Sequence, residues 1–449
     1  MIEKIIVSFV NRLNYIFSSK SFINILWLII DRIVKSVVGL AVTIYLARYL
    51  SPGAFGVYNY IISVVSMCGV FSSLGLGPVV VRELIDRKEK GKILFNALLL
   101  TMFAALIVYG LMLWFFSYSD FKDDKFRFVA VLGVSLLFRV GFVFKYWFEA
   151  KVSSKYVVYV ESLIFIFTSV LTLFLIHNNA TFISFIIVLV VDSIFVSLGM
   201  FLIFYCAEGR GLKWDFSFAE IKYLCSQSWP VLVSGIAWVG YARIDQIMIE
   251  QILGNSALGI YASASRLSEV MAFLPAVIVS SIAPGILRYR KSNVRIYNNI
   301  FQKIYNINVT FAVVIALFVT AYSEQVIDLL YGSAYKAASS VLMIQFWTFV
   351  FAALAIVSGR YYINEGMQGI TMKRHLLGFS MNVALNYFMI PVYGIDGAAL
   401  ASLISMIFAN YVYDFNGESS KLVFNQKTNA LLFIWVYEIL VSKVRGRNI

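Results

Sequence analysis

The sequence contains little of what metal-binding, disulfide-linked or catalytic proteins need. It has three isolated cysteines, Cys68, Cys206 and Cys225, and two histidines, His177 and His375. This usage fits neither a disulfide framework nor a zinc site, so we expect no metal and no cofactor. The sequence also lacks a glycine-rich phosphate loop, an HExxH pair and a nucleophile elbow. These absences argue against chemistry on a substrate.

Charged residues are scarce as well, at 14% of the chain, whereas 61% of the residues are hydrophobic and the mean hydropathy is +0.82. Because a soluble domain carries about 25% charged residues, the sequence predicts an all-α polytopic membrane protein. The net charge of +13 comes from lysines and arginines in alternate loops. We therefore expect membrane lipids, and no nucleic acid, as partners. No cleavable signal peptide is recognisable, and the first helix is expected to act as the signal.

The apolar runs predict about twelve transmembrane helices in two six-helix bundles around a central cavity. The runs lie at residues 22–47, 55–81, 93–118, 126–148, 156–177, 181–206, 229–250, 258–284, 305–331, 337–361, 376–391 and 397–413.

These runs divide the chain into four predicted parts. They are an N-terminal bundle over 1–206, a cytoplasmic linker over 207–228, a C-terminal bundle over 229–413 and a cytoplasmic or interfacial tail over 414–449. Within the tail, the apolar run 430–442 is too short to span a bilayer and is expected to lie along the interface.

Lysine and arginine gather on one side of this topology. The opposite loops hold only Arg48, the mixed-charge loop 120–127 and Lys336. By the positive-inside rule, both termini are predicted to be cytoplasmic. The cytoplasmic group comprises Lys4, Arg12, Lys20, Arg82, Arg87, Lys88, Lys90, Lys92, Lys145, Lys151, Lys155, Arg210, Lys213, Lys222, Arg288, Arg290, Lys291, Arg295, Lys303, Arg360, Lys373 and Arg374.

The two halves repeat in parallel. Residues 50–58 (LSPGAFGVY) and 253–261 (LGNSALGIY) share an Ala–apolar–Gly–apolar–Tyr core between the first two spans of each half. Such a repeat predicts a binding cavity between the halves. Pro78 in span two and Pro275 with Pro284 in span eight predict helix breaks in corresponding elements. These breaks serve either as hinges or only as static packing.

The stretch 23–50 is apolar and long enough to span, yet it carries Asp31, Arg32 and Lys35 near its middle. Charges inside a span are expected to face protein or water. Asp31 and Lys35 are four residues apart and can pair, whereas Arg32 has no opposite charge at i±3 or i±4. Arg32 is therefore predicted to bind an anionic ligand, or alternatively to pair with an acid on another helix.

Further charges fall inside the later spans. Arg243 and Asp245 face opposite ways and cannot pair locally, so Arg243 is expected to join Arg32 at the cavity. Arg266 and Glu269 are three residues apart and can neutralise each other. Arg139 and Glu161 are predicted to form a structural pair. Asp192 is the charged residue of its span and is predicted to be a protonatable group.

Several motifs resemble one family along nearly the whole chain. Asn382–Asn386 (NVALN) followed by Ile390–Ala399 (IPVYGIDGAA) resembles the signature around spans eleven and twelve of polysaccharide flippases. Six further segments resemble the same family and follow its order along the chain. They are Leu50–Pro52, Phe55–Tyr58, Asp245–Gln246, Ala257–Tyr261, Ala264–Glu269 and Leu330–Gly332. These are the O-antigen and repeat-unit flippases (Wzx type) of the multidrug/oligosaccharidyl-lipid/polysaccharide exporter superfamily.

The resemblance implies a transporter, and not an enzyme, in the bacterial inner membrane. Its substrate would be an oligosaccharide on undecaprenyl pyrophosphate, moved by alternating access coupled to an ion gradient, with a polysaccharide polymerase and a chain-length regulator as further partners. A pyrophosphate requires cations in the membrane, and the candidates are Arg32, Lys35, Arg243 and Arg266. The candidate charge partners or coupling groups are Asp31, Asp192, Asp245 and Glu269.

Two other classes remain open from sequence. A multidrug exporter of the same superfamily would be expected to have an acidic cavity for organic cations, whereas the surplus of charge here is basic. A membrane glycosyltransferase or polymerase would need an extracytoplasmic catalytic loop. No predicted outside loop exceeds about a dozen residues.

Overall fold

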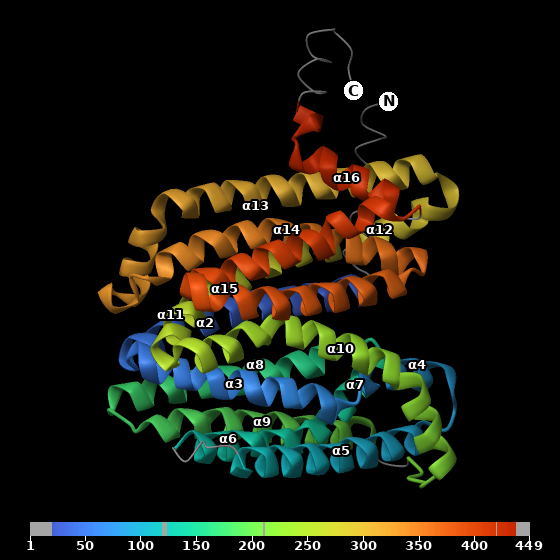
Figure 1. The fold of residues 1–449 in the computed structure, drawn as a ribbon. Helices are drawn as coiled ribbons and strands as arrows, with labels where there is room; N and C mark the ends of the chain where they lie inside the picture. Colours follow the sequence, from blue (N-terminus) through green and yellow to red (C-terminus); the bar gives the residue numbers. More distant parts are fainter. Residues whose placement is uncertain (1–19, 119–123, 210–211, 419, 437–449) are drawn as a thin grey trace. The chain divides into compact units, whose positions relative to one another are not determined.

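The computed structural model describes residues 20–118, 124–209, 212–418 and 420–436 (Figure 1). Predictions that depend on Lys4, Arg12, Asp123 or Arg210, or on the apolar run beyond residue 436, fall outside these ranges. Within them the chain forms helices and turns and contains no strand. The predicted all-α class is confirmed for this part of the chain.

The N-terminal helices follow the predicted apolar runs closely. Span four is divided into α6, the 3₁₀ segment η1 and α7, and span six is extended by the π-helical turn η2 (Tyr205–Gly209). The elements are α2 (Lys20–Tyr49), α3 (Pro52–Ser73), α4 (Leu76–Asp86), α5 (Lys90–Tyr118), α6 (Lys125–Gly133), η1 (Val134–Gly141), α7 (Phe142–Ala150), α8 (Lys155–His177) and α9 (Phe182–Phe204).

Helices α10, α13, α14 and α15 extend beyond the predicted spans, and α10 begins inside the range predicted as linker. Span eight is divided into α11 and α12. The elements are α10 (Phe218–Leu253), α11 (Asn255–Met271), α12 (Phe273–Ser292), α13 (Val294–Tyr331), η3 (Ser333–Tyr335), α14 (Ala338–Glu365), α15 (Gln368–Asn410), η4 (Val412–Asn416) and α16 (Lys421–Leu431).

Nine helical ranges in the described part of the chain are long and apolar enough to cross a membrane. One of them, Gln368–Phe415, is interrupted at Gly394 (φ 61°) and covers the predicted spans eleven and twelve. Helices α2 and α10 are not among the nine, and both carry charged and polar residues. The chain is thus a multi-pass membrane protein, and the count of twelve spans stays a prediction.

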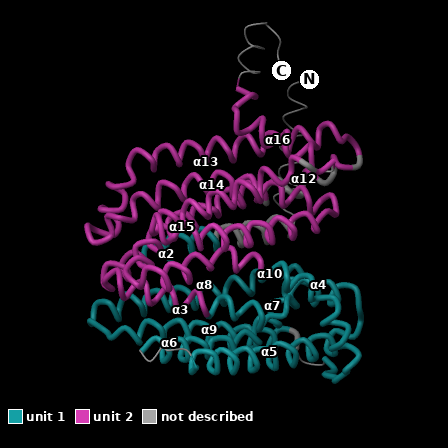
Figure 2. Tube along the Cα trace, in the orientation of Figure 1, with its two compact units in different colours: residues 1–42, 65–236 teal, residues 43–64, 237–449 magenta. Residues whose placement is uncertain are grey.

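The chain forms two compact units (Figure 2). Unit 1 comprises residues 1–42 and 65–236, and unit 2 comprises residues 43–64 and 237–449. Each unit has its own apolar core. In unit 1 the core includes Leu76, Ile93, Trp147 and Met200, and in unit 2 it includes Phe301, Tyr305, Leu354 and Val357. The predicted domain boundaries and the two-bundle repeat stay predictions.

The predicted breaks in spans two and eight exist, but proline does not cause them by removing a hydrogen bond. Pro78 is the third residue of α4 and Pro275 is the third residue of α12. The first residues of a helix have no intrahelical acceptor for their N–H groups, so proline is tolerated there. In span two the break lies before Pro78, at Leu74 (φ 50°) and Gly75 (φ 66°). Pro284 lies within α12, which continues past it to Ser292.

The two copies of the repeated motif contact each other through their glycines. A Cβ on Gly56 of α3 would lie 1.8 Å from the carbonyl oxygen of Asn255, and a Cβ on Gly259 of α11 would lie 1.8 Å from that of Pro52. Asn255 lies four residues before Gly259, and Pro52 lies four residues before Gly56. The contact is therefore reciprocal, as expected for two repeats related by a twofold axis.

Alanine at this contact is expected to destabilise the protein. In Gly56→Ala or Gly259→Ala, the new methyl group must displace a helix backbone, at a cost of about 1–3 kcal/mol. Thermal unfolding in detergent measures the effect. Gly110→Ala in α5 is the matched control, because a Cβ there meets nothing within 4 Å. Equal unfolding temperatures for all three variants would contradict the close contact.

The described part of the segment after α15 packs against helices of unit 2 through buried polar contacts. Asp414 and Lys427 form an ion pair of 2.6 Å, and both side chains are 0% exposed. Lys427 also donates to the carbonyl oxygen of Asn410, and Gln426 of α16 donates to that of Asn298 in α13. These contacts fix α16 to the ends of α13 and α15.

Candidate functional site

A charged pocket of about 610 Å³ lies in unit 1, lined by residues of α2, α7 and α8. Lys35 of α2 contacts Asp31 at 2.9 Å and Glu161 of α8 at 3.0 Å. Lys145 of α7 contacts the other carboxylate oxygen of Glu161 at 2.8 Å. The predicted pair of Asp31 and Lys35 is confirmed. Glu161 extends it into a network across three helices.

Arg32 lines the same pocket and is exposed. Among the residues that the structure describes, it has no ion-pair partner. The pocket lining contains three carboxylates, those of Asp31, Glu149 and Glu161, and three cations, so its formal net charge is zero. Attraction of an anion to this pocket therefore depends on Arg32, whose planar guanidinium suits a phosphate.

Unit 2 contains a second basic cluster. Arg243 of α10 contacts Glu269 of α11 at 3.2 Å, and Arg266 contacts the other oxygen of Glu269 at 3.4 Å. Arg266 also lies 3.5 Å from the Oδ1 of Asn59 in α3. The predicted Arg266–Glu269 pair is confirmed. Arg243 does not pair with Asp245 on its own helix, as the spacing predicts, and helix packing supplies Glu269 of α11 as its partner. That Arg243 joins Arg32 at one cavity stays a prediction. Two guanidinium groups share one carboxylate, which leaves one positive charge in excess.

Asp245 lies in a separate polar cluster, away from Arg243, as its spacing predicts. Its side chain is buried and accepts hydrogen bonds from Tyr261 at 2.8 Å, Asn386 at 2.7 Å and Ser402 at 2.5 Å. None of these partners is cationic, and the Oδ1 of Asn386 is buried without a hydrogen-bond partner in the described part of the chain. A buried carboxylate without a cation is costly, which marks Asp245 as a candidate functional group.

The predicted pair of Arg139 and Glu161 is wrong. Arg139 lies in the 3₁₀ segment η1 and donates to the carbonyl oxygen of Gly69 at 2.8 Å, whereas Glu161 contacts two lysines. A Cβ on Gly69 would lie 2.4 Å from the guanidinium, so the missing side chain makes this contact possible. Asp192 of α9 accepts a hydrogen bond from Thr168 of α8 at 3.1 Å.

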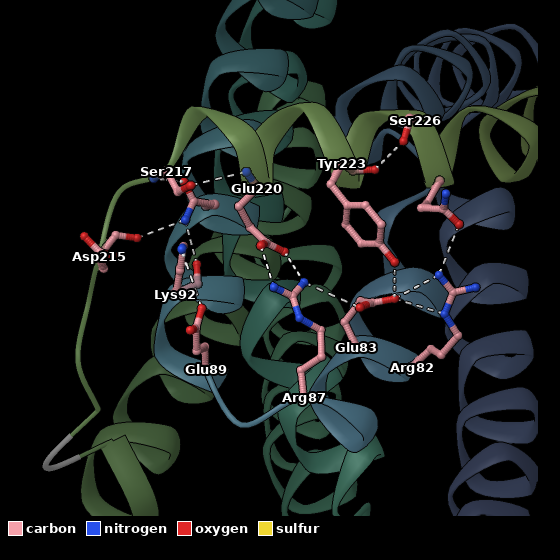
Figure 3. A network of polar contacts seen from close by, with 12 residues as sticks. Arg82, Glu83, Arg87, Glu89, Lys92, Asp215, Ser217, Glu220, Tyr223 and Ser226 are labelled. Atoms are coloured by element: carbon pink, nitrogen blue, oxygen red, sulfur yellow. Dashed lines mark hydrogen bonds and ion pairs between the residues drawn. The ribbon is translucent and has the colours of Figure 1, made fainter.

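Sequence reasoning missed an ionic network in unit 1, shown in Figure 3. Arg87, at the end of α4, contacts both oxygens of Glu220 in α10 at 2.7 and 2.8 Å. Glu83 accepts from Arg82 at 2.9 Å and from Tyr223 at 3.0 Å. Hydrogen bonding to Glu220 raises the pKa of Arg87 above its ordinary value. The i,i+4 spacing of Glu83 and Arg87 is the sequence feature that could have predicted part of this network. The network ties the start of α10 to α4.

Residues 45–340 match the family described as "Polysaccharide biosynthesis protein". The chain belongs to this family. The match runs from the last five residues of α2 to the start of α14. It includes Arg243, Asp245, Arg266 and Glu269, whereas Asn386 and Ser402, which donate to Asp245, lie outside it. The resemblance inferred from the sequence motifs is confirmed.

Two curated relatives carry transport names. The Haloferax volcanii protein named "Probable low-salt glycan biosynthesis flippase Agl15" is 25% identical over 207 residues, which is 44% of this chain and 43% of that protein. The Shigella flexneri protein named "Putative O-antigen transporter" is 24% identical over 420 residues, covering 86% of this chain and 94% of that protein.

Solved structures show the same fold. The lipid II flippase MurJ in an inward closed conformation matches with a TM-score of 0.72 and 17% identity, covering 92% of each chain. An inward-facing multidrug resistance MATE transporter of the MOP superfamily matches with a TM-score of 0.68 and 14% identity, covering 90% of this chain and 99% of that one. The chain is thus a polysaccharide biosynthesis protein by family, shares its fold with solved membrane transporters, and is similar to relatives with transport names.

Proposed function

We propose that the protein is a flippase for an oligosaccharide repeat unit linked to undecaprenyl pyrophosphate. The observation that carries the proposal is the basic cluster of unit 2, in which Arg243 and Arg266 share the single carboxylate of Glu269. A surplus guanidinium on membrane helices is costly unless an anion compensates it. Pyrophosphate is such an anion, and arginine binds it through two parallel hydrogen bonds.

The surplus of basic charge favours this function over export of organic cations. A cationic drug would be repelled by Arg243 and Arg266, whereas a lipid-linked pyrophosphate would be attracted to them and to Arg32. The MurJ and MATE structures share the fold, so the fold alone does not separate the two substrates. The choice therefore depends on the charge of the binding residues.

Analysis of extracted lipids tests the proposal. Cells that lack the gene should accumulate a single completed repeat unit on its lipid carrier, and restoring the gene should remove it. Unextended short intermediates would indicate a transferase instead, and unchanged lipid-linked sugars together with increased drug sensitivity would indicate a multidrug exporter. A polysaccharide polymerase and a chain-length regulator are the proposed downstream partners.

We further propose alternating access coupled to an ion gradient, with Asp245 as the coupling group. Its carboxylate is buried, has no cationic partner among the described residues, and lies beside the unsatisfied oxygen of Asn386. A carboxylate in these surroundings gains from binding a proton or a small cation, and neutralising it changes which conformation is favoured.

Asp245→Asn is expected to remove the response of transport to an imposed gradient. The amide keeps the shape and most hydrogen bonds but cannot take up charge. Transport of the lipid-linked sugar is measured in inverted vesicles with and without a proton or sodium gradient. Asp86→Asn, at an exposed position at the end of α4, is the control. A full gradient response in Asp245→Asn would reject this coupling role.

We propose a location in a bacterial cytoplasmic membrane with both termini in the cytoplasm. The expectation follows from the distribution of lysine and arginine. A cysteine introduced at Asn179, between α8 and α9, should react with a membrane-impermeant thiol reagent on intact cells, whereas one at Lys213, before α10, should not. The reverse labelling pattern would show that the topology is inverted.

A further inference from the structure

Unit 2 contains a pocket of about 470 Å³ that the proposed transport function does not use. Its volume falls in the range of roughly 300–1,000 Å³ typical of small-molecule sites. The walls come from α10, α12, α14 and α15 and from the junction of α11 with α12. Small residues leave the space open, namely Ala272, Ala276, Ala352, Ala355, Gly359 and Gly378.

Three polar atoms in this mostly apolar wall have no hydrogen-bond partner among the described residues. They are the Nε of Arg360, the Oγ1 of Thr371 and the Nδ1 of His375, all buried in the described part of the chain. Thr371 and His375 are four residues apart on α15 and therefore lie on one face of that helix. Buried polar groups are nearly always paired, so three unpaired ones in one pocket indicate a ligand that completes them.

The charge of the pocket selects an anion. Arg360 and Arg374 line it, and no acidic residue does so within the described ranges. Arg374 is already occupied, because it donates to the carbonyl oxygen of Ala409 and to Ser358. Arg360 is thus the guanidinium available to a ligand.

Glu365 and Asp414, which follow pocket-lining residues of α14 and α15, have other partners. Glu365 contacts Arg290 at 3.0 Å and accepts from Tyr297 at 2.9 Å, and Asp414 contacts Lys427 at 2.6 Å. Neither carboxylate lines the pocket. The positive charge of Arg360 is therefore not compensated from within the pocket.

We propose that this pocket binds an anionic phospholipid of the surrounding membrane. Its phosphate lies at Arg360, Thr371 and His375, and the beginning of one acyl chain lies along the alanine wall and Ile356. Basic pockets between membrane helices are known sites for anionic headgroups. The apolar wall favours a lipid over a free anion, since a free phosphate would leave this surface uncovered. The site is distinct from Arg32 and from the Arg243 cluster, so it does not depend on the transported substrate.

Quenching of Trp238 tests the proposal directly. Trp238 lines the pocket, and its ring centroid is 5.1 Å from that of His375. The full-length protein is placed in phosphatidylcholine nanodiscs that contain a small fraction of either brominated phosphatidylglycerol or brominated phosphatidylcholine. The phosphatidylglycerol form should quench more strongly at equal fraction, and Trp238→Phe should remove the difference.

Two variants test the headgroup and the cavity separately. Arg360→Gln should weaken the preference for phosphatidylglycerol about tenfold, because it removes the charge. Gly359 lines the pocket, and a Cβ there meets nothing within 4 Å, so Gly359→Leu should place its side chain in the pocket. Gly110→Leu is the matched control, with equally open surroundings on α5, and should keep the preference.

The possible outcomes separate the sources of the anion. A preference that survives about 10-fold excess of inorganic phosphate over the lipid supports the lipid site, whereas its loss would show that a free anion displaces the lipid and would overturn the assignment to a lipid. Equal quenching by both brominated lipids in the wild-type protein would overturn the proposal. A preference for phosphatidylglycerol that persists in both Arg360→Gln and Gly359→Leu would also overturn the proposal. None of these readouts involves sugar export, so they do not depend on the proposed transport function.

Discussion

Arg32→Ala is expected to abolish export of the lipid-linked repeat unit while the protein still inserts into the membrane. Arg32 lines the charged pocket of unit 1, where Lys35 and Lys145 are neutralised by Asp31 and Glu161. Its guanidinium is therefore the group in that pocket that remains available for a phosphate. We expect at least a tenfold loss, equivalent to about 1.4 kcal/mol or more. Export per unit of membrane protein is the measurement.

Arg32→Lys distinguishes a phosphate contact from a simple need for charge. Lysine keeps the charge but loses the planar pair of donors, so partial export is expected. Lys88→Ala, at an exposed position between α4 and α5, should be silent. Asp31→Asn should be milder than Arg32→Ala, because Lys35 keeps Glu161 as a partner. Full export by Arg32→Ala would leave Arg32 without a role in substrate binding.

Hydropathy and short-range spacing predicted much of this molecule. The predicted apolar runs follow the described helices closely, apart from the breaks inside spans two and eight, because a membrane helix must satisfy its backbone internally. Pairs at i,i+3 and i,i+4, such as Arg266 with Glu269, were predicted because they share a helix face. The reciprocal contact of Gly56 and Gly259 is visible in sequence as the shared motif, although its geometry is not.

The failures involve contacts between helices. Arg243 has no partner on its own helix, and Arg139 contacts a backbone carbonyl that Gly69 leaves accessible. Both contacts depend on how two helices rotate and cross, which a single sequence does not determine. Pro78 was misjudged for a different reason. Its effect depends on its position within the helix, and Leu74 and Gly75 break the helix before it.

The tail after Asn410 shows how composition misleads. Its residues are polar and lie outside the predicted spans, yet Asp414 and Lys427 are both fully buried and contact each other. Tyr362 donates to Asp414 at 2.8 Å, and Lys427 donates to the carbonyl oxygen of Asn410 at 2.6 Å. Buried charges persist only when they are paired and hydrogen-bonded. Polar composition alone therefore does not establish exposure.

Asp414→Ala is expected to be the most destabilising single change in unit 2. Burial lowers the pKa of Lys427, and the carboxylate of Asp414 opposes that shift. Without Asp414, the lysine must either stay charged and unpaired or give up its proton, and both cost free energy. Removing one partner of a buried pair costs about 3–5 kcal/mol. Thermal unfolding of the detergent-solubilised protein measures the loss.

The matched control is Glu324→Ala, which removes one partner of the pair between Glu324 and Lys336, whose side chains are 66% and 71% exposed. That change should cost only about 0–1 kcal/mol. As pH rises, the Asp414→Ala variant should also gain stability more steeply than the parent below about pH 7, which is the pKa of Lys427 in the parent. Its folded-state lysine pKa falls further below the unfolded value, so the unfolded state binds more protons and stability rises with pH. Equal losses in Asp414→Ala and Glu324→Ala would show that the pair between α15 and α16 contributes no more than a surface contact.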